Sequence, residues 1–121
     1  MRAHVRNIAW LSEAAREAEV TLCSGAAQVQ SFCHPCKLEL GQAITSPVHA
    51  FAAREIQLAP EQEPSIRTLQ GLAHSVVGTL VDMQQQLVSS CGFVIQLDDH
   101  LPGGLQNGDT VSFQCGRLDI W

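Results

Sequence analysis

The tetrapeptide Cys33-His34-Pro35-Cys36 is the one short motif whose residue types and spacing could do chemistry. Two cysteines at this spacing form half of a tetrahedral zinc site, in which thiolates and imidazole nitrogens bind the metal. The motif therefore makes Cys33, Cys36 and His34 candidate ligands of a zinc ion. A complete site needs a second pair of ligands, which the fold would have to bring from isolated positions: Cys23, His49, Cys91 and Cys115.

Two other interpretations of this motif compete with the metal site. A redox dithiol needs its first cysteine at the N-terminus of a helix, where the helix dipole lowers the thiol pKa. Residues 37–41 look extended and end at a glycine, so this context is missing. In the third interpretation, which we favour, the motif is a turn in which Pro35 sets the corner and both thiols are small buried hydrophobes.

A second polar cluster, Asp98-Asp99-His100, precedes a Pro-Gly-Gly loop. Two carboxylates and an imidazole could together hold a cation. Aspartates at the end of a strand more often accept hydrogen bonds from the backbone of a turn. We favour the turn for this cluster.

The chain carries no recognisable catalytic motif. It has no Gly-x-Ser-x-Gly elbow, no phosphate-binding glycine loop and no dinucleotide fingerprint. A cysteine of the tetrapeptide and His34, His49 or His74 could be drawn as a dyad, but the sequence does not place them together. We therefore assign no catalytic residues and expect a protein that is not an enzyme.

The elements that must position these residues are strands, and they are clearest in the last third of the chain. Val111, Phe113 and Cys115 alternate with polar residues, which is the period of a half-buried strand. Such alternation, with turn residues between the runs, predicts strands at 75–83, 87–98 and 110–120 and turns at 84–86, 102–103 and 107–108. Gly78 and Gly92 inside predicted strands suggest bends or bulges that let a sheet coil.

The first half of the chain gives weaker signals. Ser12 and Glu13 open a helix-prone stretch, because serine caps a helix and glutamate favours its first turn, so a short helix is predicted at 12–19. Strands are predicted at 20–23, 28–32 and 55–58, and a hinge at 59–65. Residues 20–58 and 74–121 look weakly alike, which leaves a duplicated β unit and, in preference, a single Greek-key barrel as alternatives.

The series of strands, with glycines inside two of them, resembles the OB-fold, a five-stranded Greek-key barrel, over residues 20–121. The resemblance is one of architecture and includes no family motif. It implies a single all-β, barrel-like domain and, as one function, binding of single-stranded nucleic acid. That function needs a basic groove and aromatic platforms, whereas this chain has no tyrosine and only Arg67 and Arg117 as basic residues after residue 60. Nucleic acid is therefore a disfavoured partner.

Net charge and cysteine content limit the partners and the cellular compartment that the protein can have. The net charge is −5, and residues 61–121 account for it with two basic and seven acidic side chains, which opposes binding to a phosphate backbone. Five cysteines, an odd number, without an apolar secretion signal favour reduced thiols. The sequence contains no run of about 18 apolar residues, so it predicts no membrane helix. We expect one cytoplasmic domain.

These observations favour a non-catalytic binding or assembly module. Edge strands of a small barrel offer unpaired backbone groups, to which a second copy of the chain or a strand of a partner protein can add. A protein partner and self-association as a dimer are both open, and in the dimer Trp121 is a candidate residue for packing on the second subunit. The alternatives are a zinc- or thiol-dependent protein built on Cys33 and Cys36, and an OB-type nucleic-acid binder.

Overall fold

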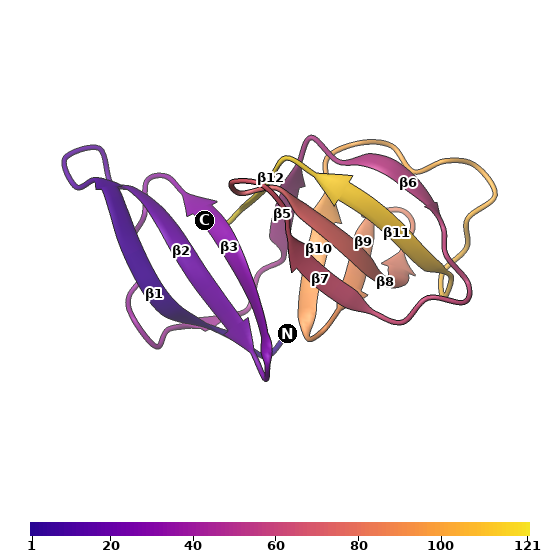
Figure 1. Ribbon diagram of the computed structural model, residues 1–121, viewed down its shortest axis with the longest axis horizontal. Coiled ribbons are helices and arrows are strands. Elements are labelled where there is room, and N and C mark those ends of the chain that lie inside the picture. The colour runs from indigo at the N-terminus through magenta and orange to yellow at the C-terminus, as the bar shows by residue number, and fades with distance from the viewer.

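The computed structural model describes residues 1–121 and contains strands but no helix, which confirms the predicted all-β class (Figure 1). The strands are β1 (Ala3–Ser12), β2 (Glu17–Ser24), β3 (Ala27–Cys33), β4 (Ala43–Ile44), β5 (Val48–Phe51), β6 (Arg54–Leu58), β7 (Ser65–Thr68), β8 (His74–Asp82), β9 (Leu87–Ser90), β10 (Phe93–Leu97), β11 (Thr110–Cys115) and β12 (Arg117–Asp119). No helix of a length and hydrophobicity that would let it cross a membrane is found.

The strands form one mixed sheet that folds into two lobes (Figure 1). The hydrogen-bonded order is β4-β1-β2-β3-β12-β5-β10-β9-β8-β11-β6, and β7 pairs with β8 beside this path. The first lobe contains β1 to β4, and the second contains β5 to β11. β12 joins the lobes, because it pairs in parallel with β3 and antiparallel with β5. β5 and β6, from the first of the two halves expected from the sequence, thus lie in the second lobe.

The short helix predicted at 12–19 is wrong. Residues 13–16 form a single turn between β1 and β2, in which Ser12 Oγ accepts a hydrogen bond from Ala15 N at 3.2 Å. Arg16, the last residue of this turn, has a φ of 58°, which lies outside the range of a right-handed helix. From Glu17 onward every second residue is buried, beginning with Ala18. Burial of one face of the sheet therefore overrides a local helix propensity that one isolated turn cannot sustain.

The strand predicted at 87–98 is two strands. Cys91 and Gly92 form a two-residue turn between β9 and β10, and Phe93 pairs with Ser90 across it. Both turn residues have positive φ, 52° for Cys91 and 86° for Gly92. Two successive positive φ values suit a tight hairpin, because they match the twist of the flanking strands. Cysteine rarely occupies such a position, so the sequence predicted a bend where the chain reverses.

The strand predicted at 110–120 divides at Gly116 into β11 and β12, which have different neighbours. β11 lies between β6 and β8 in the second lobe, whereas β12 lies between β3 and β5. The turns predicted at 84–86 and 107–108 are confirmed, since residues 83–86 connect β8 to β9 and a turn lies at 107–108. The turn predicted at 102–103 lies one residue later, at 103–104.

Gly78 lets β8 and β9 approach each other closely. A Cβ atom at this position would lie 2.5 Å from Ser89 O and 2.8 Å from Val88 Cγ1. Further along β8, between Leu80 and Asp82, the register of the β8–β9 pair shifts. The bend predicted at Gly78 is thus a place where the neighbouring strand occupies the space of a side chain.

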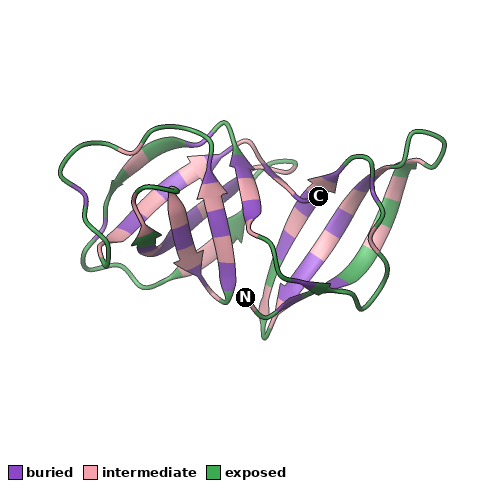
Figure 2. Cartoon of the chain, turned by 180° about the vertical axis from the view of Figure 1, so that it is seen from behind, coloured by how far each residue is buried: buried purple, intermediate pink, exposed green.

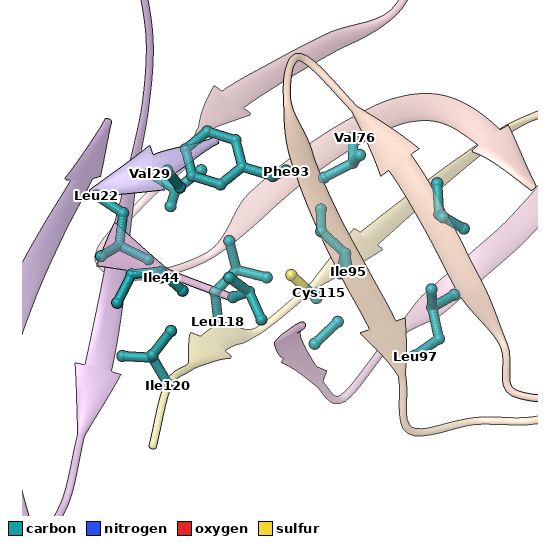
Figure 3. Packing of buried hydrophobic residues seen from close by; sticks show 14 of the residues in the cluster. Leu22, Val29, Ile44, Val76, Phe93, Ile95, Leu97, Cys115, Leu118 and Ile120 are labelled. Atoms are coloured by element: carbon teal, nitrogen blue, oxygen red, sulfur yellow. The ribbon is translucent and has the colours of Figure 1, made fainter. Parts of the chain in front are cut away.

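One apolar core runs through both lobes. Buried residues alternate with partly buried ones along most strands (Figure 2). Where the lobes join, Phe93 of β10 lies close to Val29 of β3 and Leu118 of β12 (Figure 3), and all three side chains are buried. Full burial of such a side chain contributes about 1.5–3 kcal/mol, so this contact holds the lobes together.

A buried histidine adds a polar link between the lobes. His74, the first residue of β8, is fully buried. Its Nε2 accepts a hydrogen bond from Gln30 N of β3 at 3.3 Å, and its Nδ1 lies 2.8 Å from Leu72 O. Because a backbone N–H can only donate and a carbonyl can only accept, these partners select the neutral tautomer that carries its proton on Nδ1.

Candidate functional site

The Cys33-His34-Pro35-Cys36 motif is a turn at the end of β3, as we favoured from the sequence. Cys33 is the last residue of β3, His34 and Pro35 form the turn through a cis peptide bond, and Cys36 returns to the core. Cys36 N donates to Arg16 O at 2.7 Å, and Arg16 Nε donates to Cys36 O at 3.1 Å. These bonds fasten the motif to the β1–β2 turn.

The two thiols of this motif interact, and both are buried. Burial raises the pKa of Cys33 to about 12; the hydrogen bond and charge interaction with Cys36 act in the same direction, and a backbone hydrogen bond at Lys37 opposes them. A redox nucleophile needs a lowered pKa, since the thiolate is the attacking species. Cys33 therefore has the properties of a core residue.

The structure brings Cys33 and Cys36 together but does not bring His34 to them. His34 is exposed, and its ring centroid lies 6.4 Å from that of Phe32. Nowhere in the chain do three or more histidine, cysteine, aspartate or glutamate side chains form a group that could hold a metal ion. The predicted set thus supplies two ligands at one place, where a structural zinc site uses four.

Asp98 binds the backbone of a distant segment, whereas for the Asp98-Asp99-His100 cluster we favoured contacts within its own turn. Its Oδ2 accepts a hydrogen bond from Ala52 N at 2.9 Å, and its Oδ1 accepts one from Ala53 N at 3.0 Å. Asp99 Oδ1 accepts a hydrogen bond from His100 N at 2.8 Å. Asp98 therefore fixes the segment between β5 and β6, beside the surface described next.

Aromatic and charged side chains gather on the outer side of the sheet where the two lobes join, a surface here called the junction face. Leu118 and Ile120 are buried. Side chains alternate across a strand, so the residues between and beside these two point to the outer side. Neighbouring positions of β3, β5 and β10 complete the surface. The junction face consists of Phe32, His34, His49, Phe51, Gln96, Asp98, Arg117, Asp119 and Trp121.

Arg117 lies between two aromatic rings at the centre of the junction face. Its guanidinium carbon is 4.7 Å from the ring centroid of Phe32 and 4.9 Å from that of Phe51. Its Nε and one terminal nitrogen donate to the two carboxylate oxygens of Asp119 at 2.6 and 3.1 Å. Phe32 belongs to β3 and Phe51 to β5, so Arg117 contacts both lobes. Each such cation–π contact contributes about 0.5–1 kcal/mol at an exposed site.

Trp121 is the most exposed large side chain of the junction face, with 69% of its surface accessible. Its indole stacks on the ring of His49, with centroids 3.8 Å apart and an angle of 9° between the planes. Burial lowers the pKa of His49, against the opposing effect of the Asp119 carboxylate. His49 is therefore a neutral support beneath an indole that is largely open to solvent.

Three shallow hollows surround Trp121. One of about 210 Å³ lies between Trp121 and Phe51 and includes Asp98. A second, of about 260 Å³, extends toward Arg117, and a third, of about 400 Å³, borders Cys33. The junction face is thus a contoured surface in which Trp121 lines all three hollows.

A further hollow of about 350 Å³ lies over β6, β11, β8 and β7. Gln57, Ser112 and Ser65 line it along one row of the sheet, because Ser112 pairs with Gln57 and with Val77, and Val77 pairs with Ser65. This polar row is the solvated side that an antiparallel sheet ordinarily presents.

Sequence reasoning named His34, His49, Asp98 and Trp121 separately and missed the junction face as a unit. The local signal was present, because Arg117, Asp119 and Trp121 alternate with apolar residues. Their partners come from strands 20 to 90 residues away, which no local pattern identifies. Comparison of the chain with models of known protein families, with curated proteins and with solved structures finds no match, so its geometry is the basis for assigning a function.

Proposed function

We propose that this protein is a non-catalytic assembly module in which two copies associate through the outer edge of β1. β1 is ten residues long, and its outer edge pairs with the two-residue strand β4 only at its start. Val5 then bonds to the loop before β4. From Arg6 to Leu11 this edge has no strand partner in the chain. Its amide and carbonyl groups can therefore pair with another strand.

The open edge of β1 is unusually apolar. Ile8 and Trp10 are half-buried on the inner side of the strand, and Leu11 is 56% exposed. Natural edge strands avoid pairing by carrying charges or proline. The segment between Arg6 and Glu13 carries neither, which supports a strand that accepts a partner.

The opposite edge of the sheet, β6, differs in these respects. β6 is five residues long and contains Arg54 and Glu55. Glu55 has a φ of 56°, the β6–β11 register is irregular, and Pro60 follows shortly after the strand. These features block regular strand addition, so we place the contact at β1.

An antiparallel pair of β1 strands with a two-fold axis at Ala9 fits the open edge. Ile8 of each copy then lies opposite Trp10 of the other. Aromatic and β-branched residues in such cross-strand pairs contribute about 0.2–1 kcal/mol. The arrangement is self-complementary, as a two-fold interface requires, and it places Ala9 opposite its own counterpart.

An OB-like barrel in the second lobe is the architecture that we propose to carry this module. β8, β9 and β10 form an antiparallel meander, and β11 packs along the other side of β8. β5 adds in parallel to β10. In this arrangement the open edge of β1 belongs to the first lobe and lies outside the barrel.

Charge substitutions at Ala9 test the assembly. Ala9 is exposed, so Lys or Glu at this position leaves the fold of one chain intact. Like charges directly opposite each other destabilise a strand pair, so Ala9→Lys and Ala9→Glu each abolish the dimer, and an equimolar mixture of the two variants restores it. Sedimentation velocity at high micromolar concentration measures all four samples.

Leu58→Lys is the matched control, because Leu58 is a 53% exposed leucine on the opposite edge strand. This variant is expected to dimerise like the parent. A parent protein that sediments as a monomer, or an Ala9 pair that dimerises separately as well as together, contradicts the proposal.

A further inference from the structure

The geometry points to a second binding site, beyond the assembly edge: the hollow between Trp121 and Phe51 receives an arginine side chain of a basic partner polypeptide. This hollow measures about 210 Å³ and lies over β12, β5 and β10, which are neighbours in the sheet. β2 and β3 separate these strands from β1. Its lining combines His49, Phe51, Gln96, Asp98, Asp119 and Trp121.

The aromatic part of the hollow suits a planar cation. Trp121 is held on one face by His49 and is otherwise 69% exposed, and Phe51 is 53% exposed. Guanidinium groups stack on aromatic faces better than ammonium groups do, because they are planar and weakly hydrated. The junction face already contains this arrangement, since Arg117 lies against Phe32 and Phe51.

The charged part of the hollow favours a cation over an anion. Asp98 and Asp119 both line it, and Arg117 pairs with Asp119. One negative charge is therefore left without a cationic side chain as partner. Burial lowers the pKa of His49, so this ring adds no positive charge at neutral pH. The chain as a whole carries a net charge of −5, which attracts a basic partner.

Single-stranded nucleic acid is the competing occupant, because it also uses exposed aromatic rings. Its phosphates need free cationic groups beside those rings. Here Arg117, the one arginine of the junction face, donates to both oxygens of Asp119. The observations thus favour the arginine side chain.

Fluorescence of Trp121 reports directly on this hollow. The chain has two tryptophans, so Trp10→Phe leaves Trp121 as the only reporter. The probe is a short acetylated peptide amide in which arginine and glycine alternate. We expect a saturable change of Trp121 fluorescence with this peptide, a weaker one with the lysine analogue, and none with the analogue that contains citrulline, the uncharged isostere of arginine.

Substitutions at Gln96 separate binding from folding, because they change the charge of the hollow in opposite directions. Gln96 lines the hollow, and its amide donates to Gln85 O at 3.0 Å near the surface. Gln96→Glu is expected to strengthen binding of the arginine peptide about threefold at low salt, and Gln96→Lys to weaken it about threefold. Gln96→Glu loses the donor to Gln85 O, whereas Gln96→Lys keeps an N–H donor at this position. Urea unfolding of both variants therefore measures their stabilities beside their affinities, so that a difference in binding is not mistaken for a difference in folding.

Two results overturn the inference. One is the absence of any saturable change of Trp121 fluorescence with the arginine peptide. In the other, the affinities of the Gln96 variants stand in the reverse order, with Gln96→Lys binding more tightly than Gln96→Glu, and the protein binds an oligothymidine more tightly than the peptide. This result assigns the junction face to nucleic acid. Neither result depends on whether the protein dimerises through β1.

Discussion

His74 shows how one residue can make the stability of this fold depend on pH. Its two ring nitrogens contact Gln30 N and Leu72 O, partners that only the neutral imidazole satisfies. Protonation would place a second N–H against the Gln30 amide in a fully buried position. Burial accordingly lowers the pKa of His74, with the hydrogen bond to Leu72 acting in the opposite direction.

We predict that the free energy of unfolding falls as the pH decreases below about 6.5. The unfolded chain binds a proton on each histidine near pH 6.5, whereas folded His74 and His49 bind it only at lower pH, because burial lowers both pKa values. Between these values the unfolded state binds more protons, so stability rises with pH and is complete above about pH 7. Urea unfolding between pH 5 and 8 measures the slope.

Two variants test whether His74 and His49 cause this dependence of stability on pH. His74→Asn and His49→Gln are each expected to reduce the pH dependence below pH 6.5, because each removes one group that is neutral in the fold. His4→Gln is the control, because it replaces a histidine that is exposed. A slope that is identical in the parent and in both test variants contradicts the prediction.

At the level of residues, the sequence identified turns and missed contacts between distant segments. Pro35 and the spacing of Cys33 and Cys36 were sufficient to favour a turn with buried thiols, because proline restricts its own backbone wherever it occurs. The stacking of Arg117 between Phe32 and Phe51 depends on how β3, β12 and β5 are ordered. No property of these three residues alone specifies that order.

At the level of elements, Gly78 controls the spacing of two strands. The neighbouring strand β9 comes so close that a Cβ atom on Gly78 would lie 2.5 Å from Ser89 O. Real Cβ atoms do not approach backbone oxygens to this distance, so β8 and β9 would have to separate.

Gly78→Ala is therefore expected to destabilise the protein by about 1–3 kcal/mol, the cost of forcing an extra carbon into a packed site. Gly103→Ala is the matched control, because nothing lies within 4 Å of a Cβ atom there and its φ is not positive. Its effect should stay within about 0.5 kcal/mol. Chemical denaturation compares the two, and equal stabilities would show that β9 yields to a methyl group.

Alternation of polar and apolar residues predicted where strands lie but not where they end. β11 was expected because Val111 and Phe113 face the core, and the structure agrees. The helix expected at 12–19 failed, since Ala18 is needed on the inner face of β2. The hairpin at Cys91 was hidden because a cysteine adopts a backbone conformation that sequence rules reserve for glycine or asparagine.

At the level of the whole molecule, β12 makes the two lobes one unit. Leu118 is buried in the same apolar cluster as Val29 of the first lobe and Ile95 of the second. A cluster shared in this way couples the lobes, because neither can expose its inner face without opening the core of the other.

The lobes are accordingly expected to unfold together. In a Trp121→Phe background, fluorescence of Trp10 reports on the first lobe and far-UV circular dichroism reports on the whole sheet, so the two midpoints should coincide. Leu118→Ala should lower both midpoints equally, at a cost of about 2–5 kcal/mol. Leu58→Ala, on an exposed side chain, should leave them unchanged. Separate midpoints for the two probes would contradict a shared core.

The pairing of β12 with β3 also has a consequence in time. Leu118 meets Ser31 across about 90 intervening positions, and the first lobe has no partner for the free side of β3 until that meeting occurs. Loop closure over such a distance costs entropy before any contact offsets it, so sheets built on remote pairings fold in milliseconds to seconds. During synthesis on the ribosome, β1 to β3 would emerge early and wait for the last strand, with the apolar edge of β1 open throughout.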